Sequence, residues 1–122
     1  MKNKYTISST NNFDISDIKF NQDGLVPVIS QCVHTGIILM MAWMNKEALK
    51  KTIDTNDMYY FSRSRQKLWQ KGETSGHFQK LHELRLDCDN DTILALIDQT
   101  GSACHTGAKS CFFKSIKDIR ND

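Results

Sequence analysis

The sequence lacks a long apolar run, contains a single proline and carries almost no net charge, and each of these features excludes a class of protein. Its longest apolar run, residues 37–44, is too short to cross a bilayer. The polar segment 1–17 has no apolar core of the kind found in a secretory signal. A net charge of +2 does not by itself indicate binding to nucleic acid. We therefore expect a cytoplasmic protein with neither a membrane nor a nucleic-acid partner.

No internal repeat, low-complexity stretch or proline-rich linker divides the chain, so its 122 residues predict one domain. A composition of 39% hydrophobic and 25% charged residues is typical of globular proteins. Residues 1–12, rich in serine, threonine and asparagine, are predicted to be a flexible N-terminus, and residues 13–122 the single domain. A domain of this size buries a limited core, so an oligomer or a bound metal would stabilise it.

The apolar pattern predicts an α+β fold, mostly antiparallel β-sheet with one or two helices. Segments 25–33 and 37–44 indicate a hairpin whose second strand is buried on both faces. Asn45 is the predicted N-cap of a helix. The side chains that this helix is expected to turn inward are Ala48, Leu49, Thr52 and Ile53. Further strands are expected around residues 58–64, 67–70, 84–88, 92–99 and 111–114, and a short helical turn within residues 13–20.

Three of the four cysteines, Cys88, Cys104 and Cys111, fall in the last third of the chain. Without export they should stay reduced, and thiolates are the preferred soft ligands of Zn²⁺. Three protein ligands leave a fourth position open for water, as in a catalytic zinc site. The alternative is that these cysteines are small buried hydrophobic residues, and their spacing matches no tight CxxC motif. Spacing alone leaves the two interpretations even. Cys32 is assigned to packing.

The first of these cysteines lies inside the acidic segment DCDND. On an extended strand, Asp87, Asp89 and Asp91 would share one face and reach a single hard cation such as Mg²⁺. Cys88 would then point to the opposite face. The alternative is a solvated acidic turn without an ion. An EF-hand is excluded, because Thr92 stands where the sharp turn of that loop requires glycine.

The segment 62–77 combines cations, hydroxyl groups and a loop bounded by glycines. Such a set predicts a phosphate receptor, because guanidinium, ammonium, hydroxyl and backbone N–H groups all donate to phosphate oxygens. A charged hairpin with a solvated face is the commoner outcome of this charge pattern alone. If the segment is a strand, Arg63 and Arg65 lie on one side of it. The candidate substrate and phosphate contacts are Ser62, Arg63, Ser64, Arg65, Lys71, Glu73, Thr74, Ser75 and His77.

Of the histidines, His105 is the strongest candidate for catalysis, because it directly follows Cys104 in a predicted loop beside the metal. It would act as a general base or hold the zinc-bound water. For His77 and His82, the alternative to a functional role is an ordinary polar position. His34 lies at a predicted hairpin tip, where exposure to solvent is expected.

Taken in order and spacing, these motifs resemble the phosphoribosyl-AMP cyclohydrolase family. The resemblance covers about residues 24–113 and rests on the segments LMMAWMNKEAL, SRSRQKLWQKGETSGH, DCDND and ACHTGAKSCF. It implies a homodimer with one zinc per subunit, bound across the interface by Cys88, Cys104 and Cys111, and Mg²⁺ at Asp87, Asp89 and Asp91. Trp43, Phe61 and Cys32 depart from the expected pattern, but none of them is an expected metal ligand.

The resemblance also implies a nucleotide substrate and a reaction. The adenine ring of phosphoribosyl-AMP would be opened at its N1–C6 bond by a zinc-activated water with Mg²⁺ assistance. The product is the phosphoribosylformimino aminoimidazole carboxamide nucleotide, in the third step of histidine biosynthesis. One rival is a zinc-stabilised module whose basic segment and Trp69 contact RNA, with binding that weakens steeply with salt. A thiol redox protein is the second rival, although no CxxC pair is present.

Overall fold

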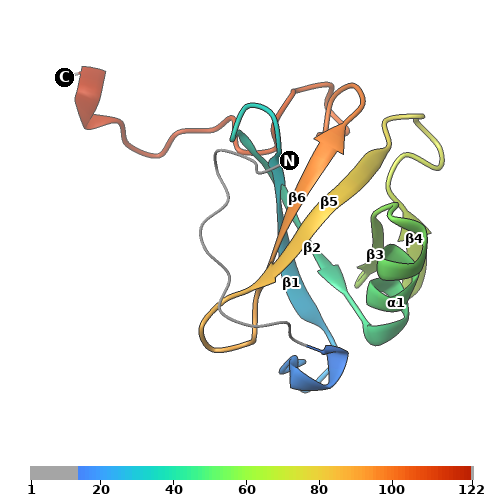
Figure 1. Cartoon of the computed structure of the whole chain (residues 1–122). Helices are drawn as coiled ribbons and strands as arrows, with labels where there is room; N and C mark the ends of the chain where they lie inside the picture. The colour runs from blue at the N-terminus through green and yellow to red at the C-terminus, as the bar shows by residue number, and fades with distance from the viewer. Residues whose placement is uncertain (1–13, 122) are drawn as a thin grey trace.

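The computed structural model describes residues 14–121, which form two β-sheets, one α-helix and two 3₁₀ helices (Figure 1). The larger sheet consists of β1 (Val26–Cys32), β2 (Ile38–Met44), β5 (Gln79–Leu86) and β6 (Ile93–Gln99). The remaining elements are α1 (Lys46–Thr55), the pair β3 (Tyr59–Ser62) and β4 (Lys67–Gln70), η1 (Ile15–Asp17) and η2 (Ile119–Asn121). The expected flexible N-terminus, residues 1–12, lies outside the described residues.

The larger sheet has the order β2-β1-β6-β5, and all of its pairings are antiparallel except that of β1 with β6. Together with β3–β4 and the single α-helix, this confirms an α+β fold of mostly antiparallel sheet. In Figure 1, α1 and the β3–β4 pair lie together beside the larger sheet. No helix of the described residues is long and apolar enough to cross a membrane.

The predicted hairpin of β1 and β2 is present, with Val26 opposite Met44 and Ser30 opposite Met40. The expectation that its second strand is buried on both faces was wrong. Ile38 and Met41 are 40% and 39% exposed, because β2 is an edge strand and packs mainly through its other side chains. The buried side chains of β2 are Leu39, Met40 and Met44.

Helix α1 begins at its predicted N-cap, where Asn45 Oδ1 accepts a hydrogen bond from the Ala48 N–H at 2.8 Å. It ends at Asn56, whose φ of 63° is left-handed, a conformation that asparagine tolerates at a helix C-terminus. Ala48, Leu49 and Thr52 are buried as predicted. Ile53 is 47% exposed, so its assignment to the core was wrong, since it lies at the margin of a narrow apolar stripe.

A buried polar network connects the smaller pair of strands to the larger sheet. Tyr60 of β3 donates from its hydroxyl to Gln79 Oε1 at 2.6 Å, and Gln79 Nε2 donates to Gln99 Oε1 at 2.7 Å. Tyr60 and Gln79 are both almost fully buried, and burial raises the pKa of Tyr60, so its phenol stays protonated. Because buried polar groups are costly when unpaired, this chain of bonds fixes β3 relative to β5 and β6.

The two loops that carry the candidate metal ligands lie at opposite ends of β6 (Figure 1). The turn of residues 87–92 precedes this seven-residue strand, and residues 100–111 follow it. A strand of this length spans roughly 20 Å. The position of β6 therefore separates Cys88 from Cys104 in space, although both were candidates for one zinc site.

The short strand expected at residues 111–114 is not formed. The Cys111 N–H donates to Leu39 O of β2 at 2.7 Å, but the Phe112 N–H donates to Ser110 Oγ at 3.0 Å and the pairing does not continue. Beyond this point the chain extends away from the body (Figure 1). Phe112 and Phe113, which lie in this segment, are 62% and 54% exposed.

Candidate functional site

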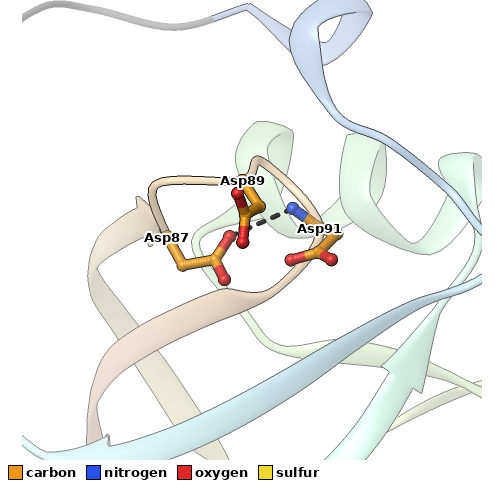
Figure 2. Close-up of side chains that lie close together, drawn as sticks. All are labelled: Asp87, Asp89 and Asp91. Atoms are coloured by element: carbon orange, nitrogen blue, oxygen red, sulfur yellow. Dashed lines mark hydrogen bonds between the residues drawn. The ribbon is translucent and has the colours of Figure 1, made fainter.

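The three aspartates of the DCDND segment lie on the turn between β5 and β6 (Figure 2). Strand β5 ends at Leu86, and Asn90, with a φ of 62°, turns the chain back toward β6. The Asp91 N–H donates to Asp87 Oδ1 at 3.1 Å, which closes the turn. The extended strand predicted for this segment was therefore wrong.

The three carboxylates nevertheless come together, as predicted. One oxygen from each of Asp87, Asp89 and Asp91 lies within 4.8 Å of the others, and all three residues are exposed. Like charges at this separation repel one another, so a cation among them is favourable. Oxygen ligands of this kind suit hard cations such as Mg²⁺. The turn can therefore hold a divalent cation at the surface.

Cys104 and Cys111 lie on the loop that follows β6, close enough for each thiol to affect the pKa of the other. Cys104 is 7% exposed. Thr106 Oγ1 donates to Cys104 Sγ at 3.0 Å, which lowers the pKa of the Cys104 thiol, and the thiol of Cys111 adds to this effect. Burial raises the pKa of Cys111, and so does its interaction with Cys104. The hydroxyl of Thr106 therefore favours a thiolate at Cys104.

Lys71 lies beside these two thiols. Its Nζ donates to Ala103 O at 2.7 Å, next to Cys104 in the chain. Burial lowers the pKa of Lys71, while the Cys111 and Cys104 thiols act in the opposite direction. A cation beside the pair favours their ionised form.

Cys88 does not join this pair within one chain. In the part of the chain that the structure describes, only the three aspartates form a group of three or more histidine, cysteine or acidic side chains with ligand atoms within 4.8 Å. Cys88 is exposed on the acidic turn, at the other end of β6. Cys32, assigned to packing, is partly buried against the core.

A cavity of about 550 Å³ opens beside Cys111. Its walls come from β3, β4, the loop after β4 and the cysteine loop. The predicted substrate residues that line it are Ser62, Arg65, Lys71, Glu73, Thr74 and Ser75, and His105 lines it as well. The cations and hydroxyl groups of residues 62–75 therefore share one cavity with the thiol of Cys111.

Three candidates, Arg63, Ser64 and His77, lie outside the lining of this cavity. Strand β3 ends at Ser62, and residues 63–66 form the turn to β4, so the expectation that the two arginines share one side of a strand was wrong. The Arg63 guanidinium lies 4.7 Å from the ring centroid of Trp43. Ser64 Oγ lies 3.3 Å from Ser62 Oγ. The third, His77, contacts the loop that leads to Cys104.

Sequence reasoning missed several residues of the site. Gln70 of β4 lines the cavity and was not a candidate, and Trp69, which also lines it, was considered only as an RNA contact. Lys67, a cation of the predicted phosphate receptor, lies beside them because β4 pairs with β3. The charged hairpin considered for this part of the sequence could have indicated that β4 lies beside β3. Thr106, whose hydroxyl donates to Cys104 Sγ, was also missed.

Comparison with known proteins identifies the class of this site. The family model described as phosphoribosyl-AMP cyclohydrolase matches residues 40–113. A phosphoribosyl-AMP cyclohydrolase of Acidiphilium cryptum (strain JF-5) is 57% identical over 102 residues, which is 84% of this chain and 88% of that protein. One from Rhodospirillum rubrum is 61% identical over 99 residues, 81% of this chain and 69% of that protein.

A third relative is longer. The histidine biosynthesis bifunctional protein of Prochlorococcus marinus is 58% identical over 105 residues, which is 85% of this chain but 46% of that protein. Identities of this size over most of the chain place it among enzymes. The chain belongs to the phosphoribosyl-AMP cyclohydrolase family, which confirms the resemblance noted in its sequence.

Proposed function

We propose that this chain hydrolyses the N1–C6 bond in the adenine ring of phosphoribosyl-AMP, as a cytoplasmic enzyme of histidine biosynthesis. The observation that carries the proposal is the cavity in which Arg65, Lys71 and His105 surround Cys111. The names of the relatives support the reaction, and the name of the bifunctional relative supports the pathway.

The cavity suits a substrate with phosphate groups at both ends. Arg65 presents a planar fork of donors that pairs with two phosphate oxygens, and Lys71 adds a second cation. The hydroxyls that add further donors belong to Ser62, Thr74 and Ser75. Trp69 offers an aromatic face against which a purine ring can stack. These groups bind and orient the substrate, and none of them needs to react.

The thiols fit a zinc ion. Cys104 has a depressed pKa and accepts a hydrogen bond from Thr106, so it is prepared to bind as a thiolate, and Cys111 opens onto the cavity. Cys88 from a second copy would complete a set of three thiolates with one position open. When bound, zinc supplies a Lewis acid that makes water acidic enough to serve as a nucleophile near neutral pH.

His105 is the proposed proton carrier. The water oxygen loses both of its protons as it becomes the carboxamide oxygen on C6. N1 must gain one of them as the N1–C6 bond breaks, and the exocyclic nitrogen on C6, or bulk water if that nitrogen is already protonated, takes the other. The His105 side chain lines the cavity, one residue from Cys104, so an imidazole nitrogen can accept the first proton and return it to N1.

The aspartates fit Mg²⁺, since their oxygens already lie within 4.8 Å of one another. Asp87, Asp89 and Asp91 would hold this ion. When bound, Mg²⁺ would neutralise phosphate charge on the substrate.

The position of β6 supports the proposal of a homodimer with shared sites. The cavity with Cys104 and Cys111 lies beyond one end of this strand, and the acidic turn with Cys88 precedes the other. In a two-fold dimer, the acidic turn of each copy can meet the cavity of the other, which makes two equal sites. Exposed apolar side chains of β2 and of the segment after Cys111 support this arrangement, because a dimer interface would bury them. They are Ile38, Met41, Phe112, Phe113, Ile116 and Ile119.

The direct test is an assay of purified, zinc-replete protein with phosphoribosyl-AMP, in which the absorbance of the ring-opened product is followed. We expect turnover that is lost in Cys111→Ser. Zinc-loaded protein that forms no product would overturn the proposal. If the protein instead binds RNA with an affinity that falls steeply with salt, and shows no turnover, the binding-module alternative is correct.

A further inference from the structure

We propose that His77 is a positioning residue, which holds the loop carrying Cys104 and Cys111 in place without touching substrate or metal. This role replaces the phosphate contact expected from the sequence. The proposal rests on the zinc site of the proposed function and adds to it a residue that acts on the cysteines through the backbone.

Two glycines make room for His77. A Cβ on Gly72 would meet the backbone of His77 and Phe78 at 2.7 Å, so the cavity loop folds back tightly on its own end. A Cβ on Gly101 would meet His77 Cδ2 at 2.6 Å and Nε2 at 2.8 Å. Since real Cβ atoms do not approach other atoms so closely, the imidazole ring can lie this close to the backbone only because residue 101 is glycine.

Hydrogen bonds reinforce this contact. Ser102 Oγ lies 3.4 Å from Nδ1 of His77. Gln99 Nε2 donates to His77 O at 3.2 Å and to Thr100 O at 2.9 Å, and Gln79 of the buried polar network donates to Gln99 in turn. His77 is thus linked to the residues on both sides of Gly101, and the link continues into the core of the domain.

Lys71, at the start of the cavity loop, makes a second connection to the same region through Ala103 O. The cavity loop, residues 71–77, therefore supports the segment 99–103 at both of its ends. This segment leads directly into Cys104, and residues 100–118 contain no helix or strand that could fix the thiols. A loop without regular structure takes its position from such contacts, and metal ligands must be held to within fractions of an ångström.

The test compares three full-length variants with the wild-type chain. His77→Ala removes the ring. His77→Asn keeps the planar group, with atoms where Cγ, Nδ1 and Cδ2 of the ring lie. His82→Ala is the matched control, because His82 is an exposed histidine of β5 outside both loops. Hydrogen exchange of residues 101–111 is measured on metal-free protein, and zinc affinity is measured by competition with a chelator.

We expect His77→Ala to exchange faster across residues 101–111 and to bind zinc on the order of 10-fold more weakly, as is usual when a group that orients metal ligands is removed. Its turnover should fall with little change in KM, since the phosphate contacts remain. His77→Asn should recover most of both losses, and His82→Ala should match the wild type. Unchanged exchange and zinc affinity in His77→Ala would overturn the proposal.

Gly101→Ala, made in both the wild-type and the His77→Ala chains, gives a second test. It compares two backgrounds and so does not depend on the folding of His77→Ala alone. In the wild-type background its Cβ meets the His77 ring and its φ of 71° is strained. In the His77→Ala background only the strain remains, so the loss of zinc affinity caused by Gly101→Ala should be smaller there. Equal losses in the two backgrounds would contradict the ring contact. A wild-type chain that binds no zinc would refute the proposed function, while the exchange data still decide the role of His77.

Discussion

The two loops beyond the ends of β6 differ in whether one chain brings their proposed metal ligands together. On the acidic turn, Asp87, Asp89 and Asp91 converge within one chain. On the cysteine loop Cys104 and Cys111 lie close enough to affect each other's pKa, and Cys88, the third proposed zinc ligand, lies beyond the other end of the strand. Ligands spaced by two residues can be gathered by one turn. A ligand separated by a whole strand needs either a fold that returns to it or a second copy of the chain.

The largest expected effect comes from the cysteine loop. Cys111→Ser should remove zinc and lower turnover by on the order of 10³-fold, since a Lewis acid supplies several kcal/mol of transition-state stabilisation. Metal analysis and the ring-opening assay measure both effects. Cys32→Ser is the control, because Cys32 lies against the core and outside both loops. A fully active Cys111→Ser, or much less than one zinc per wild-type chain, would contradict the zinc site.

The next prediction tests whether the cysteine site is completed by a second copy. Cys88→Ser and Cys104→Ser should each be inactive alone. When they are mixed and reassembled, one site of each mixed dimer keeps all three thiolates, so about a quarter of wild-type activity should return. Mixed dimers are verified by mass spectrometry.

Two results would break the comparison between the loops. Verified mixed dimers that stay inactive would show that one chain builds the site alone. A protein that sediments as a monomer at its working concentration would do so more directly.

The acidic turn should respond differently from the cysteine loop. Asp89→Asn should weaken the Mg²⁺ dependence of turnover by on the order of 10-fold, because the number of charged ligands sets cation affinity. Zinc content should not change, since the aspartates are not part of the thiol pair. Activity is titrated with Mg²⁺ and zinc is measured on the same samples. Loss of zinc with an unchanged Mg²⁺ response would show that the two ligand sets are not separate.

The smallest effects are expected in the basic segment that faces the cysteine loop. Arg65 lines the cavity, so Arg65→Ala should raise KM about 10-fold with a smaller change in turnover, the usual effect of losing a charge-assisted hydrogen bond. Arg63 lies over Trp43, so Arg63→Ala should raise KM roughly twofold or less, like other exposed charges. Steady-state kinetics of the two variants provide the comparison. Equal effects would mean that both arginines bind phosphate.

Much of the fold could be predicted, because it depends on local signals. The β1–β2 hairpin and the Asn45 cap follow from residues that are close in sequence. Predictions that depended on the surroundings were wrong. Ile53 and the outer face of β2 are exposed, and Phe112 makes no strand, since burial depends on which element lies opposite. The spacing of apolar residues along the sequence does not show which element packs against them.

The sequence by itself determined the chemical groups of this enzyme: the thiols, the carboxylates, the cations and their order along the chain, which together identify the family. It also determined that the aspartates would meet, because two-residue spacing keeps them close in either a strand or a turn. Only the tertiary structure decided that β6 separates Cys88 from Cys104, that Arg63 and Arg65 diverge, and that His77 lies against Gly101. These are contacts between distant segments, and they are set by the packing of the whole domain.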